Sequence, residues 1–132
     1  MANIDLKNDI KQLIALDVQA IASDTTTVGN EIDLAGYESA TVILFCGAVA
    51  AGDVTLLVQD SDTSGSGFVD VADDFLIGSE VDTNIAAANG IARIGYVGKK
   101  RYLKVSAVTA NSANLTAGAV AVLGSPRHAV VA

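Results

Sequence analysis

The chain has 132 residues, a formal net charge of -7 and 51% hydrophobic residues, with no Trp and only three Phe and three Tyr. This length fits one domain large enough to bury a core. The acidic balance argues against a nucleic-acid-binding protein, because phosphate binding needs cations clustered over a wide face. The scarcity of aromatic residues argues against an aromatic-lined ligand pocket.

No membrane segment or secretory leader is evident in the sequence. No apolar run approaches the roughly 20 residues of a membrane-spanning helix, and acids stand where a leader would be charged and then apolar. We therefore expect the protein in the cytoplasm of the cell that makes it, without membrane contact. Cys46 is the only cysteine and lies in an apolar run. A buried core residue is its simplest interpretation, and a reactive thiol is the alternative.

The first 17 residues are expected to form a separate arm or short helix, with the β domain at residues 18–132. Ile10, Leu13 and Ile14 fit one face of a helix whose first turn contains Asp9. An extended arm that becomes ordered only against a partner is the alternative, since chain termini are commonly loose unless docked. Such a segment often ties subunits together, so its apolar side chains are candidate partner-binding residues: Ile4, Leu6, Ile10, Leu13 and Ile14.

Short segments rich in β-forming residues recur roughly every ten residues from residue 18 onward. Residues 39–49 form the strongest of them and are apolar on both faces, which favours the middle of a sandwich or contact with another subunit. A turn at residues 50–53 should return residues 54–59 beside them as a hairpin. The other expected strands are residues 18–22, 31–34, 68–71, 75–77, 85–88 and 117–123.

A second hairpin is expected over residues 90–107. Apolar and polar residues alternate over residues 91–96 and again over 102–107, as in strands with one buried face. The turn between them contains Gly98, which is free to take a positive φ. Roughly seven to nine strands predict an all-β fold, a single-domain β-sandwich or barrel (jelly-roll-like) with an N-terminal arm or short helix. Because Ala and Val are abundant, we expect a core of small and β-branched side chains.

The turn of this second hairpin is basic, with Lys99, Lys100 and Arg101 in sequence. As a charged hairpin tip, these residues would keep a sheet edge from pairing with foreign strands. As a basic knob, they would bind an acidic surface, including that of a neighbouring copy. Both interpretations stay open, and all three residues are candidate partner-binding residues.

Residues 60–67 (DSDTSGSG) begin like a calcium-binding loop, with oxygens at alternate positions and Gly at the sixth. The twelfth position of such a loop needs a bidentate Glu, and here it is Val71. A solvated hairpin loop is the simpler interpretation. We therefore expect no metal site and no cofactor.

The sequence also offers little for catalysis. His128 is the only histidine and lies beside Pro126 and Arg127 near the C-terminus, whereas a catalytic base needs a nucleophile and an orienting group held rigidly. The adjacent acids Asp73 and Asp74 are typical of a soluble surface. We therefore expect no catalytic residues and no enzymatic activity.

Several segments together resemble a group of small structural proteins of tailed bacteriophages and prophages. The resemblance covers most of the chain, from residue 18 to residue 128, and its most specific part is Gly-Tyr-Val-Gly-x-x-Arg-Tyr at residues 95–102. The segments that carry it are residues 31–34 (EIDL), 36–41 (GYESAT), 59–62 (QDSD), 95–102 (GYVGKKRY) and 123–128 (LGSPRH).

This resemblance implies a virion component rather than an enzyme. A capsid decoration (cement) protein fits best: it would bind the major capsid protein on the outside of the assembled shell, as a homo-oligomer with a trimer favoured. Its location would be the capsid surface, after a stay in the host cytoplasm during assembly. A tail or neck protein is one alternative. A virion-surface carbohydrate-binding module is another, with Tyr37, Tyr96 and Tyr102 as its available tyrosines.

Overall fold

Two strands of 25 residues each, β3 (Tyr37–Ser61) and β7 (Tyr102–Pro126), organise the fold in the computed structural model, which describes residues 10–126. They pair antiparallel along their whole length, from Tyr37 opposite Pro126 to Ser61 opposite Tyr102. The other elements are β1 (Lys11–Ile21), β2 (Thr26–Asp33), β4 (Val69–Asp70), η1 (Asp73–Phe75), β5 (Leu76–Ile77), η2 (Glu80–Thr83) and β6 (Ile91–Tyr96).

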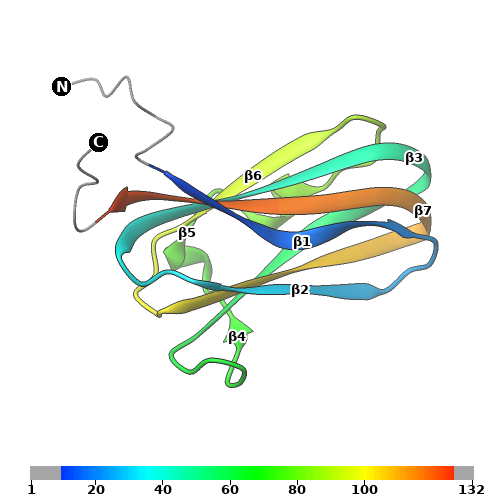
Figure 1. The fold of residues 1–132 in the computed structure, drawn as a ribbon. Coiled ribbons are helices and arrows are strands. Elements are labelled where there is room, and N and C mark those ends of the chain that lie inside the picture. The colour runs from blue at the N-terminus through cyan, green and yellow to red at the C-terminus, as the bar shows by residue number, and fades with distance from the viewer. Residues whose placement is uncertain (1–9, 127–132) are drawn as a thin grey trace.

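Both long strands bend sharply near their middle, at the right-hand end of the view in Figure 1. The pairing register shifts between Cys46 and Asp53, and Gly52 has a φ of 75°. In β7 the bend occurs at Asn111 and Ser112, with φ values of 63° and 60°. Each bend carries the chain from one layer of the fold to the other.

The result is a β-sandwich made by one antiparallel sheet that folds over on itself (Figure 1). In the first layer, residues 37–46 of β3 and 117–126 of β7 are flanked by β1 and β6, and β5 follows β6. In the second layer, residues 53–61 of β3 and 102–110 of β7 are flanked by β2 and β4. The all-β, single-domain expectation is confirmed, as a sandwich and not as a closed barrel.

Alternate residues of the long strands fill the space between the layers. Val42 and Leu44 of the first layer and Leu56 and Val58 of the second are at most 2% exposed. Facing them, β7 contributes an alternating series of small residues with exposures of 0–3%: Ala113, Leu115, Ala117, Ala119, Ala121 and Leu123. Alanine at every second position lets the layers stack closely. The expected core of small and β-branched side chains is confirmed.

Cys46 belongs to this core. Its side chain is 5% exposed, and burial raises the pKa of its thiol. A raised pKa keeps the sulfur in its unreactive thiol form. The core interpretation of Cys46 is confirmed.

The expected hairpin of residues 39–49 with 54–59 is wrong. Residues 54–59 pair with β7 and not with the first arm of β3. The physical reason is burial: Leu44 and Leu56 both face the interior, which requires the two arms to lie in opposite layers. The bend at Gly52 therefore connects the layers instead of closing a hairpin.

The expected hairpin over residues 90–107 is wrong for the same reason. β6 pairs with the first arm of β3, with Tyr96 opposite Ala40, whereas residues 102–108 pair with β2 and with the second arm of β3. The loop 97–101 crosses from the first layer to the second, which lets both strands turn an apolar face inward.

The N-terminal region departs from expectation as well. Lys11–Ile21 form β1, an edge strand paired with β7, so the helical alternative does not hold for residues 11–16. The expected boundary between residues 17 and 18 falls inside this strand. Residues 1–9 lie outside the described part of the chain, as do the candidate residues Ile4 and Leu6 and the histidine His128.

The shorter predicted strands are reduced in the structure. Residues 68–71 and 75–77 contribute only β4 and β5, of two residues each, and residues 85–88 contribute a single bridge between Ile85 and Val54. Within residues 10–126, no helix has the length and apolar character needed to cross a membrane.

Candidate interaction surfaces

The predicted basic residues lie in the loop 97–101 between β6 and β7, which we call the basic loop. Nζ of Lys100 is 3.7 Å from Oδ1 of Asp60. Arg101 makes a fork with Asp33, with Nε and Nη2 each donating over 2.9 Å. The hydrogen bonds from Arg101 and from the Ala35 amide lower the pKa of Asp33 to about 2. Lys99 is exposed and makes no hydrogen bond or ion pair within the described residues. Two of the three predicted partner-binding cations are thus used inside the subunit.

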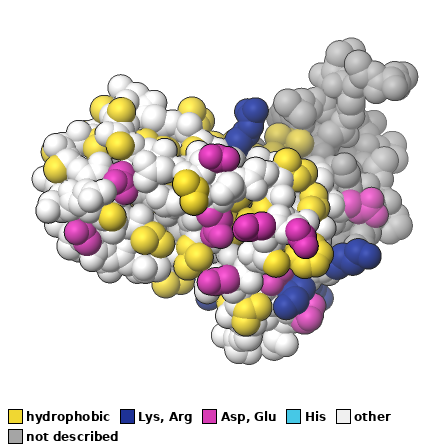
Figure 2. Space-filling model, turned by 180° about the vertical axis from the view of Figure 1, so that it is seen from behind, with side chains coloured by type: hydrophobic (Ala, Val, Ile, Leu, Met, Phe, Trp, Pro, Cys, Tyr) yellow, Lys and Arg dark blue, Asp and Glu magenta, His cyan; other side chains and the backbone are white. Residues whose placement is uncertain are grey.

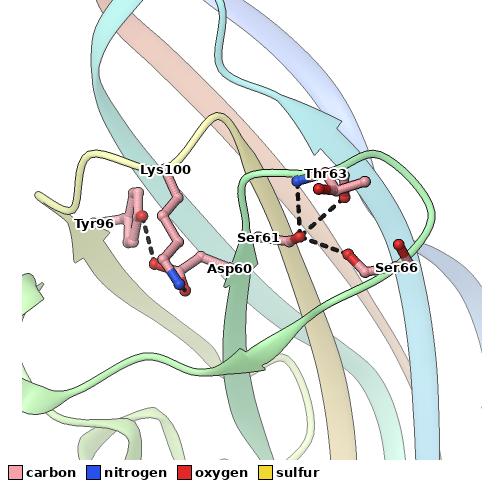
Figure 3. A network of polar contacts seen from close by, with 6 residues as sticks. All are labelled: Asp60, Ser61, Thr63, Ser66, Tyr96 and Lys100. Atoms are coloured by element: carbon pink, nitrogen blue, oxygen red, sulfur yellow. Dashed lines mark hydrogen bonds and ion pairs between the residues drawn. The ribbon is translucent and has the colours of Figure 1, made fainter.

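Beneath the basic loop, a buried polar contact joins the two layers (Figure 3). The Tyr96 hydroxyl donates to Oδ2 of Asp60 over 2.6 Å, and the two residues are 3% and 5% exposed. Burial, together with the bond to Asp60, raises the pKa of Tyr96. Because Tyr96 lies in the first layer and Asp60 in the second, this hydrogen bond fastens the layers at one end of the sandwich.

The loop of residues 60–67 is held by its own side chains, as Figure 3 shows for Ser61. The Ser61 hydroxyl lies 2.9 Å from the carbonyl oxygen of Thr63 and 2.5 Å from that of Ser66, and accepts from the Thr63 amide. Glu31 accepts from the Gly65 amide over 2.6 Å. Since β3 and β4 pair on either side of this loop, the hairpin-loop interpretation is confirmed. Among the described residues, no group of three or more His, Cys, Asp or Glu is placed to hold a metal.

A hollow of about 630 Å³ opens at the same end of the molecule. It lies between residues 34–40, where β2 passes into β3, and residues 96–101. Tyr37, Glu38 and Lys99 are among its walls. The hollow places the exposed Lys99 beside the start of β3, so a polar partner could contact both.

The outer side of the first layer presents a continuous apolar surface, which we call the apolar face: Ile14, Val18, Ile43, Phe45 and Val120. Ile14 and Val18 are 53% and 60% exposed. The sheet register brings Ile14 and Ile43 to either side of Val120. A Cβ on Gly118 would lie 2.6 Å from Val18 and 3.2 Å from Phe45, so these two side chains close over the glycine.

The outer side of the second layer is more polar. Gln59 and Lys104 lie opposite each other, and Lys104 stacks on the ring of Phe68 with its Nζ 4.2 Å from the centroid. Seen from behind, the molecule mixes acidic and hydrophobic side chains (Figure 2). The apolar face is therefore the broad surface most suited to burial against a partner.

Sequence reasoning found part of this surface. The two-faced apolar character of residues 39–49 predicted contact on both sides, and Ile43 and Phe45 are indeed the outward-facing members of that run. Ile14 was a candidate residue and lies on the apolar face, whereas Ile10 and Leu13 are half-buried. Val18 and Val120 were missed, because only the strand register reveals that β1 and β7 lie beside β3.

No protein-family model matches the chain, and no curated protein matches it. Two solved structures are similar to it. One is the SPBc2 prophage-derived protein YomS, with a TM-score of 0.49 at 12% identity over 89% of this chain and 94% of that one. The other comes from Bacillus endospore appendages, described as a family of disulfide-linked pili, with a TM-score of 0.49 at 13% identity over 96% of both chains.

Proposed function

We propose that this protein is a structural component of a phage virion, a capsid decoration protein that binds the major capsid protein on the outside of the shell. The observation that carries the proposal is the apolar face, with Val18 60% exposed at its margin. The resemblance of residues 95–102 and the other quoted segments to phage structural proteins supports it. The proposal assigns the chain no enzymatic activity, and locates it in the host cytoplasm before assembly.

The physical logic rests on flatness and copy number. A sheet face with small side chains such as Val18 and Val120 can lie against another flat surface with good packing. One such contact is modest, but many copies at symmetric positions reinforce a shell through multivalency. The hydrogen bond between Tyr96 and Asp60 keeps the two layers together, so that the face stays rigid.

The test replaces one valine of the apolar face and a matched valine elsewhere. Val18 on β1 and Val28 on β2 are 60% and 62% exposed, and both lie on edge strands, but Val28 belongs to the second layer. In co-sedimentation with empty shells of the phage that encodes the chain, Val18→Lys should lose affinity by about tenfold or more, because a charge would be buried at the contact. Val28→Lys should bind like the unaltered protein. Equal binding by both variants would contradict the proposal.

Truncation tests the N-terminal segment, which we expect to contribute to assembly. Removal of residues 1–16 would be destructive, because Ala15 and Leu16 are 0% and 1% exposed in the core. Removal of residues 1–9 leaves β1 intact, so this shorter deletion is the one to compare with the full chain.

The carbohydrate-binding alternative depends on exposed aromatic side chains. Tyr96 is unavailable for it, because this residue is buried against Asp60. Tyr37 and Tyr102 are half-buried. The tail or neck alternative predicts rings or tubes of purified protein, which electron microscopy would reveal.

A further inference from the structure

The edge of β6 is open over part of its length. On one side, β6 pairs with β3 from Ile91 to Tyr96. On the other side, β5 pairs only with Gly95 and Tyr96. The Gly90 carbonyl accepts from the Cys46 amide, so the backbone groups of even-numbered residues face β3 and those of Ile91 and Arg93 face away. Within residues 10–126, no strand pairs with Ile91 or Arg93 on that outer side.

Another edge of the same molecule is covered. The second arm of β3 donates its Leu56 amide to Oγ1 of Thr83 and its Val58 amide to Oε2 of Glu80, over 3.0 and 2.7 Å. These side chains occupy the positions that a neighbouring strand would take. Folded proteins usually protect their edges in such ways, because an open edge is a template for pairing. The open stretch at Ile91 and Arg93 lacks this cover.

The open stretch also adjoins an apolar groove. A depression of about 210 Å³ is lined by Ile43, Ile91, Ala92 and Arg93. Ile91 is 72% exposed, and Ile77 beyond it is 65% exposed. Free backbone groups provide affinity for an extended peptide, and a flanking groove selects its side chains. Together they are the requirements of a strand-addition site.

We propose that this edge of β6 binds the extended N-terminal segment, residues 1–9, of a second copy of the chain. The segment alternates apolar and charged residues, with Ile4 and Leu6 separated by Asp5, as an added strand would. Its Asp5 complements Arg93, which has no ion pair within the described residues. The proposal deepens the proposed function, on which it rests, by naming the contact between copies.

The positions of the two partners favour a second copy. The segment precedes β1, and β1 and β6 lie on opposite flanks of β7 and β3 in the first layer. A contact between opposite edges of neighbouring copies is head-to-tail, and it closes into a ring when the rotation permits. Nine extended residues reach about 30 Å, so the segment could also cross its own sheet. The experiment must separate these two routes.

Disulfide trapping separates them. Ile4→Cys and Ile91→Cys are made as two separate proteins, both with Cys46→Ala to remove the native thiol. Mixed under mild oxidation, they should give a covalent heterodimer, seen as twice the monomer mass on a non-reducing gel. No heterodimer would overturn the proposal. A single chain carrying both cysteines that closes on itself as a monomer, whatever the protein concentration, would also overturn it.

The oligomeric state gives an independent test. By sedimentation velocity without shells, the full chain should form an oligomer, and removal of residues 1–9 or Ile91→Lys should convert it to monomer. The control Val28→Lys carries the same charge on the second layer and should stay oligomeric. An Ile91→Lys variant that stays oligomeric would overturn the edge contact. Shell binding is judged separately by Val18→Lys, so that failure of this contact and failure of the proposed function are distinguishable.

Discussion

Gly29 of β2 marks the point where β1 and β2 approach most closely. A Cβ at this position would overlap the carbonyl oxygens of Ala15 and Val105, and both atoms belong to the backbone. Because neither strand can yield without losing its ladder, we expect Gly29→Ala to destabilise the fold by about 1–3 kcal/mol. Chemical denaturation measures the change. Gly47→Ala is the control, since a Cβ there would have no neighbouring atom within 4 Å; an equal loss in both variants would contradict the argument.

The Asp33–Arg101 fork makes stability depend on acid pH. The pKa of Asp33 falls from 3.8 to about 2 on folding. The carboxylate therefore contributes stability that is complete above the ordinary Asp pKa and is lost as the pH falls through about 2. The contribution is small, because both side chains are about half exposed and solvent screens them.

Asp33→Asn should accordingly lower the melting temperature slightly at pH 6 and leave it nearly unchanged at pH values well below the pKa of about 2, where the native carboxyl is also neutral. A melting series over this range, by circular dichroism, compares the two proteins. A difference that grows toward low pH would have the wrong sign and would contradict the assignment.

Individual residues were predictable where their surroundings are local in sequence. Cys46 was recognisable as a core residue because it sits inside an apolar run. The bond between Tyr96 and Asp60 was not, because 36 residues separate them and only the crossing of the two layers brings them together. The basic loop was found by composition, but its pairing with Asp33 and Asp60 depends on the same crossing.

At the scale of elements, η2 serves as a cover for the edge of β3. Thr83 is 0% exposed, and its hydroxyl accepts from the Leu56 amide and donates to the Glu80 carbonyl. Thr83→Val keeps the shape and leaves the Leu56 amide buried without an acceptor, so we expect a loss of about 1–3 kcal/mol in the free energy of unfolding. Thr83→Ser keeps the hydroxyl and should lose less. Urea denaturation of both variants tests this, and a greater loss for serine would contradict it.

Strands were predictable, but their partners were not. Alternation over residues 39–49 and 102–107 correctly identified parts of β3 and β7. Nearness in sequence suggested hairpins, whereas Leu44 and Leu56 are both buried only if the chain changes layer at Gly52. A turn that closes a hairpin and a bend that joins two layers use the same small and polar residues, so composition alone does not separate them.

At the scale of the whole molecule, β3 and β7 make the two layers one cooperative unit. Each strand runs through both layers, and Asp24 holds the bend of β7 by accepting from the Ser112 and Ala113 amides over 3.2 and 2.8 Å. Neither layer can open without pulling on the strands that form the other. The apolar face and the edge of β6 are therefore carried on one rigid body.

This continuity predicts uniform protection in native-state hydrogen exchange. The amides of Val105 in the second layer and Ala121 in the first should open with free energies equal to within about 1 kcal/mol and with the same urea dependence. Asp70 of the two-residue strand β4 should exchange at a lower free energy, because few neighbours hold it. If Val105 instead exchanged several kcal/mol more easily than Ala121, the second layer would open alone. The bends in β3 and β7 would then act as hinges between two independent sheets, and a partner bound to the first layer would leave the second free to unfold.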